Sequence, residues 1–162
     1  MAQVAFWLTL AAAAATGLLA GASLDQSIKQ LPARHRIGAE AYSAYSQASD
    51  LGNGILFYGV LGVGAALLAL AAAVAAHVAE LPGAACVSAD LGAAFAVLHS
   101  VVTARAAPTN FSQRHVQGDP RALARVLDRF AEYQAVRAGL QAVNFGVLLW
   151  ALVAITDASR AG

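Results

Sequence analysis

The sequence predicts an all-α membrane protein, a bundle of four transmembrane helices in which the second and fourth helices extend beyond the bilayer. Hydrophobic residues make up 59% of the 162-residue chain and charged residues only 12%, with a mean hydropathy of +0.62. A soluble domain carries about twice that charged fraction. In addition, four apolar stretches each approach the roughly 20 helical residues that cross a hydrocarbon core.

These stretches define the spans of a single integral membrane domain covering residues 1–162. The spans are expected at about residues 4–23, 53–77, 84–105 and 136–157, with polar loops at 24–50 and 106–135. The first stretch ends in Ala20-Gly21-Ala22, as signal peptides do, but no Lys or Arg precedes it, and we interpret it as a span. Gly17, four residues before Gly21, predicts a close approach of a neighbouring helix.

The second span continues a helix that starts in the polar segment before it. We expect a break at Leu31-Pro32, after which apolar residues recur at spacings of four and three from Ile37 towards Tyr58. This face includes Ala41 and Ala44. The third span is expected to end near Arg105 and to be followed by irregular chain over 107–118, which is rich in Pro, Asn and Gly.

The last helix begins at Asp119-Pro120, because Asp is a favoured N-cap and Pro a favoured first helical residue. It is expected to continue to about Asp157 and to contain the fourth span. Its first half is amphipathic, with an apolar stripe formed by Leu123, Val126, Leu127 and Phe130. We expect this stripe to pack outside the membrane against Ile37, Ala41 and Ala44.

Polar residues inside the spans predict a pocket within the bundle. His99 lies in the third span, and the stripe that passes through Phe130 becomes polar at Arg137, Gln141 and Asn144. Such side chains are costly against lipid, so they should face the bundle interior. Counting about 1.5 Å per residue along each helix brings one polar layer together at the level of His99: Thr16, Tyr58, Gln141 and Asn144, with Asp50, Asn53 and Arg137 at its mouth.

Asp90 is the other ionisable residue of the third span. It precedes His99 by nine residues and therefore lies on the opposite face of the helix. We expect a second buried polar site there, in contact with another helix or subunit. His77, by contrast, is expected to be solvated at the end of the second span.

The positive charges predict the orientation of the chain in the membrane. Nine of the ten Lys and Arg residues lie on the side of the two long loops, and only Arg160 lies on the other side. By the positive-inside rule, the protein is a multi-pass protein of the cell (inner) membrane with both loops cytoplasmic and both termini outside.

The sequence contains few signs of cofactor chemistry. Cys86 is the one cysteine, and there is no His-Glu-x-x-His motif, so no metal site and no cofactor are predicted. A haem held by His99 alone is left open, because no second histidine is expected at its depth. The arginines are scattered along a solvated helix face and do not indicate a nucleic-acid partner.

Two short motifs carry a resemblance to a known family. Pro108-x-Asn110, and Phe130-x-x-Tyr133-Gln134-x-x-Arg137 further on, resemble the anthrone-oxygenase-like family of small four-span bacterial membrane proteins, most of them of unknown function. Phe130 and Tyr133 stand where that family usually has tryptophans. The resemblance implies oxygenation of a polycyclic phenol without metal or flavin.

Two functions of different class follow. In the first, the pocket binds an amphipathic aromatic or quinone-like molecule, with Arg137 and Asn110 holding a phenolate and His99 acting as general base. In the second, the protein is a non-catalytic structural or accessory subunit of a larger membrane complex. Its polar layer then holds the helices together, and Gly59, Gly62 and Ala66 dock a partner subunit or a second copy.

Overall fold

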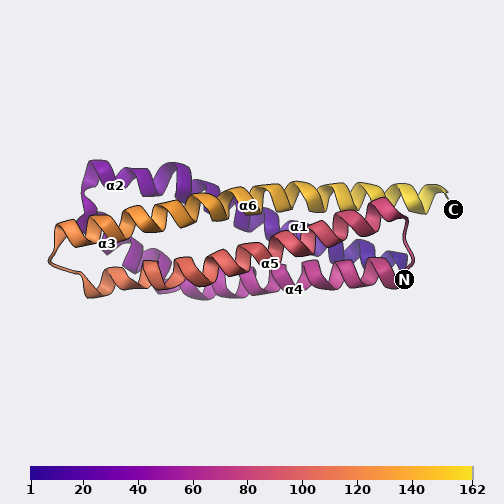
Figure 1. The fold of residues 1–162 in the computed structure, drawn as a ribbon, viewed down its shortest axis with the longest axis horizontal. Helices are drawn as coiled ribbons and strands as arrows, with labels where there is room; N and C mark the ends of the chain where they lie inside the picture. The colour runs from indigo at the N-terminus through magenta and orange to yellow at the C-terminus, as the bar shows by residue number, and fades with distance from the viewer. Residues whose placement is uncertain (162) are drawn as a thin grey trace.

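The computed structural model describes residues 1–161, and this part of the chain is helical apart from short turns, with no β-strand (Figure 1). The α-helices are α1 (Ala2–Asp25), α2 (Leu31–Ile37), α3 (Ala39–Ala48), α4 (Gly54–Val78), α5 (Gly83–Ser112) and α6 (Pro120–Ala161). Two π-helical segments, η1 (Gln26–Gln30) and η2 (Ser49–Asn53), continue α1 into α2 and α3 into α4. A 3-10 turn, η3 (Gln113–His115), follows α5.

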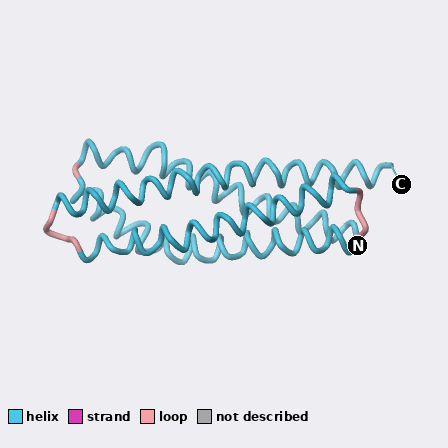
Figure 2. The backbone as a smooth tube through the Cα atoms, in the orientation of Figure 1, coloured by secondary structure: helices cyan, strands magenta, loops and turns pink. Residues whose placement is uncertain are grey.

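These elements form four long helical rods, which confirms the predicted all-α four-helix bundle. Each rod is long and apolar enough to cross a membrane, over Ala2–Ile37, Ala39–Val78, Gly83–His115 and Pro120–Arg160. At about 1.5 Å per residue, rods of this length exceed a hydrocarbon core of about 30 Å. Both chain ends and the α4–α5 turn lie at one end of the bundle, and the α2–α3 and α5–α6 connections lie at the other, the loop end (Figures 1 and 2).

The rods pack as a closed ring in which α1 and α5 each contact both α4 and α6. Alanine dominates the core, with Ala12, Ala69 and Ala96 packed around Leu148, and Ala76 packed against Ala89 nearer the turn end. Small side chains let helix backbones approach closely, which is how membrane helices gain packing energy.

Two glycines lie where helices approach most closely. A Cβ atom on Gly17 would come within 2.9 Å of the Phe145 ring, so the predicted close approach at Gly17 is confirmed. Gly21 has no such neighbour within 4 Å. A Cβ atom on Gly92 would lie 2.7 Å from Cδ2 of Leu148, a fully buried side chain.

The loop end of the bundle has its own apolar core, formed by Leu31, Tyr42, Ala106, Leu123, Leu127 and Phe130. The extended helices therefore pack together as expected, but the predicted α3 face was wrong. Ile37, Ala41 and Ala44 are exposed, and Tyr42 is buried in their place. The reason is that η2, with non-helical angles at Gly52, shifts the helical phase between α3 and α4. A helical face that is extrapolated from α4 back through η2 therefore falls on the exposed side of α3.

Two expected irregular segments are in fact helical. The chain does not break at Pro32, which occupies the first turn of α2, where its missing N–H costs little. Helix α5 continues past Arg105 and through Pro108 to Ser112. The chain reverses around Gly118, whose φ of 88° suits glycine.

The predicted start of the last helix is confirmed. Asp119 Oδ1 accepts hydrogen bonds from the backbone N–H groups of Arg121 and Ala122, at 3.0 and 2.9 Å. Pro120 is the first residue of α6.

Replacing Gly92 with Ala should destabilise the bundle by about 1–3 kcal/mol, since overpacking a tight core has that typical cost. The added methyl meets a buried leucine that has little room to move. Gly139→Ala is the matched control, because nothing lies within 4 Å of its Cβ position. The control should be neutral or slightly stabilising. Thermal unfolding in detergent measures both, and equal midpoints would contradict the predicted contact.

Candidate functional site

A cavity of about 440 Å³ lies between the first half of α4 and the second half of α5, with α1 and α6 forming its inner wall. Five residues predicted from the sequence line it: Asp50, Tyr58, His99, Asn110 and Arg137. The rest of the lining is mainly apolar, including Leu19, Ile55, Phe111 and Phe130.

The cavity exists because α4 is loosely packed where it enters the bundle. Leu56, Phe57, Val60 and Val63 are all more than half exposed, whereas further along α4 five alanines are buried: Ala69, Ala72, Ala73, Ala75 and Ala76. Gly59 and Gly62 line the cavity and have no neighbour within 4 Å of a Cβ position, so this wall is made largely of backbone. The kink in η2 sets the direction in which α4 enters the bundle.

Arg137 brings a positive charge to the inner wall. Its Nε donates to Thr103 Oγ1 at 3.1 Å and its Nη1 donates to Gln134 Oε1 at 2.8 Å. Both acceptors are neutral, and no carboxylate within residues 1–161 lies within 4.0 Å of the guanidinium. The cation is thus positioned by hydrogen bonds and has no ion-pair partner in the described chain.

Asp50, which the sequence places with Arg137 at the mouth of the polar layer, makes other contacts. Its Oδ2 accepts from Gln26 Nε2 at 2.8 Å and from Ser46 Oγ at 3.2 Å. Asp50 and Arg137 therefore flank the cavity and do not form a closed pair across it. The two opposite charges give the cavity a negative and a positive side.

The hydrogen bonds of His99 define its protonation pattern. Its Nε2 lies 2.9 Å from Gln141 Nε2, an amide nitrogen that can only donate, so His99 Nε2 accepts. Thr103 Oγ1 lies 3.3 Å from the same nitrogen. Because Thr103 already accepts from Arg137, its hydroxyl hydrogen is available to donate to His99. With the Gln141 amide oriented in this way, a neutral ring carries its proton on Nδ1.

Asn110 is held from behind by a residue that was not predicted from the sequence. Gln113 is fully buried and its Nε2 donates to Asn110 Oδ1 at 2.8 Å, while its Oε1 accepts from Ser43 Oγ at 2.8 Å. This network ties α5 to α3 and leaves the amide nitrogen of Asn110 without a hydrogen bond to the described residues. Gln113 was missed because its segment was expected to be irregular.

Thr103 and Gln134 were also missed, although periodicity could have found both. Thr103 follows His99 by four residues and shares its helix face. Gln134 follows Leu127 by seven residues and continues the buried stripe of α6. Each of them positions Arg137.

The deeper polar residues lie below the main cavity. Thr16, Gln141 and Asn144 surround a separate void of about 10 Å³, which also touches His99. Gln141 Oε1 and Asn144 Oδ1 are buried with no hydrogen-bond partner in the described chain. Asn53 lies apart from all of these, in an outward groove beside Leu56 and Phe57.

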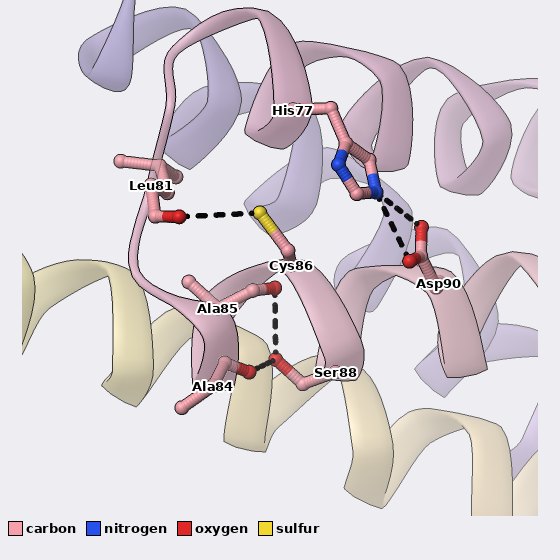
Figure 3. Close-up of polar contacts among 7 residues, drawn as sticks. All are labelled: His77, Leu81, Ala84, Ala85, Cys86, Ser88 and Asp90. Atoms are coloured by element: carbon pink, nitrogen blue, oxygen red, sulfur yellow. Dashed lines mark hydrogen bonds and ion pairs between the residues drawn. The ribbon is translucent and has the colours of Figure 1, made fainter.

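The expected contact of Asp90 with another helix is present, but the prediction that this site is buried was wrong. Asp90 is exposed, and both of its carboxylate oxygens lie 3.0 Å from His77 Nε2 on the neighbouring helix α4 (Figure 3). His77 is exposed, as expected for it. Asp90 and His99 do lie on different faces of α5, but the face that carries Asp90 is exposed and not in the core. Close by, Cys86 Sγ donates to Leu81 O at 3.3 Å (Figure 3).

A metal-binding group is not found among residues 1–161, where no three His, Cys, Asp or Glu side chains come together. The mainly apolar walls carry three groups that can donate hydrogen bonds to a ligand: the Arg137 guanidinium, the Asn110 amide and the Tyr58 hydroxyl. All three can donate to an oxygen atom of a bound molecule.

The hydrogen bond from Gln141 should hold His99 in the Nδ1-protonated form. In ¹⁵N–¹H spectra of histidine-labelled protein, His99 should give the signals of that neutral tautomer. Gln141→Met removes the donor while keeping most of the volume, and it should redistribute the tautomers. Thr16→Val, a change in the same deeper layer, should leave them unchanged. An Nε2-protonated ring in the unmodified protein would contradict the assigned donor.

The comparisons with known proteins do not assign a family. The resemblance to the anthrone-oxygenase-like family stays a prediction from Pro108, Asn110, Arg137 and the four-span layout. No protein-family model matches this chain, and no curated protein or solved structure matches it either.

Proposed function

We propose that the cavity binds a mostly apolar, amphipathic small molecule, aromatic or quinone-like, through one anionic or carbonyl oxygen. The observation that carries this proposal is Arg137, a largely buried cation on the cavity wall with no carboxylate partner in the described chain. An arginine stays protonated at physiological pH, and a buried charge is costly unless it is paired or hydrated. An anionic ligand oxygen would supply the missing partner.

Other cavity residues support the same ligand chemistry. Tyr58 lines the cavity and makes no hydrogen bond within residues 1–161, so its hydroxyl can donate to a ligand. The free amide nitrogen of Asn110 is a second donor. The cavity volume of about 440 Å³ lies within the range of about 300–1,000 Å³ that is typical of small-molecule pockets.

The ligand would enter from the bilayer. Gly59 and Val63 of α4 and Ser100 and Ala104 of α5 line the cavity and are also exposed on the outside of the bundle. They border a gap between the two helices that faces the hydrocarbon region. This favours access from the membrane over the access from the loops that the sequence suggested. In this proposal Gly59 and Gly62 form part of the cavity wall. The accessory-subunit function would instead use the same two glycines as a docking face.

Oxygenation of a bound phenol is a chemical extension of this proposal. A methylene group flanked by aromatic rings would lose a proton to a base, and molecular oxygen would oxidise it to a ketone with release of water. His99 Nε2 already receives hydrogen bonds from Gln141 and Thr103. It could take that proton only after one donor moved away, so binding is the function that the geometry supports best.

Removing the charge of Arg137 should weaken ligand binding while leaving the bundle folded. Arg137→Met keeps much of the stem volume, and a hydrogen bond to a charged group contributes about 1.5–3 kcal/mol, which corresponds to about 10- to 150-fold in affinity. The measurement is titration of purified protein with a hydroxylated anthraquinone. Mass spectrometry of co-purifying small molecules identifies any native ligand.

The matched control is Arg121→Met, which removes an exposed arginine far from the cavity lining and should leave binding unchanged. Equal affinities for Arg137→Met and unmodified protein would overturn the proposal. So would an absence of binding by a folded wild-type protein, and the polar layer would then serve helix packing alone.

We also propose that the loop end faces the cytoplasm of the cell membrane. Arg34, Arg105, Arg114 and other basic residues gather there, and the positive-inside rule depends on such an excess. Cysteine replacement tests this in a Cys86→Ala background. Gln117→Cys should resist a membrane-impermeant thiol reagent in intact cells, whereas Ser159→Cys near the other end should react quickly. Gln117 is preferred to Gly118, whose φ of 88° disfavours a side chain. The reverse labelling pattern would invert the orientation.

A further inference from the structure

A groove on the outside of the bundle carries three arginines. It runs between the loop-end parts of α5 and α6, measures about 780 Å³ and is lined by Arg105, Arg125 and Arg129. Tyr133 and the hydroxyl-bearing residues Thr109 and Ser112 complete its polar lining. Ala104 is the one lining residue that it shares with the ligand cavity, so the two sites are distinct.

The charge of this arginine groove is uncompensated within the described chain. None of its three arginines forms an ion pair there, and no Asp or Glu lines it. Asp128, the nearest acidic residue on α6, is held by Arg34 Nη2 at 2.8 Å. Glu132 is exposed outside the lining and contacts none of the arginines within ion-pair distance. The groove therefore presents a positive surface to any anion.

The expected boundary of the fourth span places the groove near the depth of lipid headgroups. Thr103 contacts Arg137 and His99 contacts Gln141, so α5 and α6 are antiparallel with Arg105 level with Ala135, next to the expected start of the fourth span. At about 1.5 Å per residue, Arg129 is about 9 Å and Arg125 about 15 Å further from the membrane centre. Each headgroup layer is about 5–8 Å thick, so flexible arginine side chains reach it from both sides.

We propose that the arginine groove binds the headgroup of an anionic phospholipid, with its phosphate held by Arg105, Arg125 and Arg129. Arginine suits this role because its planar fork donates two parallel hydrogen bonds to a phosphate. Tyr133, near the expected membrane surface, has the ring and hydroxyl that suit an interfacial position. The acyl chains would leave the groove past Ala104, along the lipid-facing side of α5.

Native mass spectrometry of delipidated protein in a neutral detergent tests the site by titration with phosphatidylglycerol and, separately, phosphatidylcholine. Unmodified protein should retain one phosphatidylglycerol in preference to phosphatidylcholine. Each basic residue near an anionic lipid contributes about fivefold in affinity, so the double variant Arg125→Gln/Arg129→Gln should bind phosphatidylglycerol about 25-fold more weakly. Its binding of phosphatidylcholine should not change.

The matched control is Arg36→Gln/Arg160→Gln, which removes the same charge from exposed positions outside the groove. It should change phosphatidylglycerol binding by less than about twofold, because exposed charges beyond about 10 Å are screened in ordinary buffer. An equal loss in both double variants would mean diffuse attraction and would overturn the proposal. Circular dichroism checks that each variant is folded.

Two further measurements decide whether the arginine groove binds a lipid headgroup or free phosphate. Arg125→Lys/Arg129→Lys keeps the charge and loses the forked geometry, so it should bind with intermediate affinity. Inorganic phosphate is then added as a competitor at concentrations matched to the lipid. If it displaces phosphatidylglycerol at those concentrations, the groove is a site for free phosphate and the lipid assignment fails. If it does not, the lipid headgroup is the ligand.

Discussion

The guanidinium of Arg137 is the group around which the interior of this bundle is arranged. Thr103 and Gln134 bind it through neutral oxygen atoms. Thr103 also contacts His99, and His99 in turn contacts Gln141. Neutral acceptors orient a cation without neutralising it. In a protein interior this leaves a strong field directed into the adjoining space, and that space is the cavity.

The two halves of the bundle have different packing because their side chains differ in size and place. Towards the turn end, alanines from α4 and α5 meet closely, and Gly92 lets Leu148 fill the space beside it. Towards the loop end, large apolar side chains on α4 face outward, so little fills the interior. The apolar cap around Leu127 then closes the bundle beyond the cavity. A cavity can persist there because packing on both sides holds the helices apart.

Much of this arrangement could be predicted from the sequence, because hydropathy and helical periodicity are strong signals in membrane helices. The four rods, the start of α6 at Pro120, and the convergence of Tyr58, His99 and Arg137 on one cavity follow from such counting, whereas Asn110 was predicted through the family resemblance. The predictions that were wrong depended on the local rotation of a helix about its axis. Two π-helical segments are not visible in the residue pattern, so the inward face of α3 was assigned to Ala41 when it includes Tyr42. The pairing of Asp90 with His77 depends on helix rotation, which periodicity does not supply.

The contact between His77 and Asp90 joins α4 and α5 beside their connecting turn. This end of the α4–α5 hairpin is thus fastened, and the cavity lies along the other half of the same two helices, with Gly59 in its wall. Gly59 lies 18 residues from His77, a lever arm of about 27 Å at about 1.5 Å per residue. A rotation of about 2° at the fastened end therefore moves the arm by about 1 Å, so small adjustments at one membrane face change the width of an opening near the other.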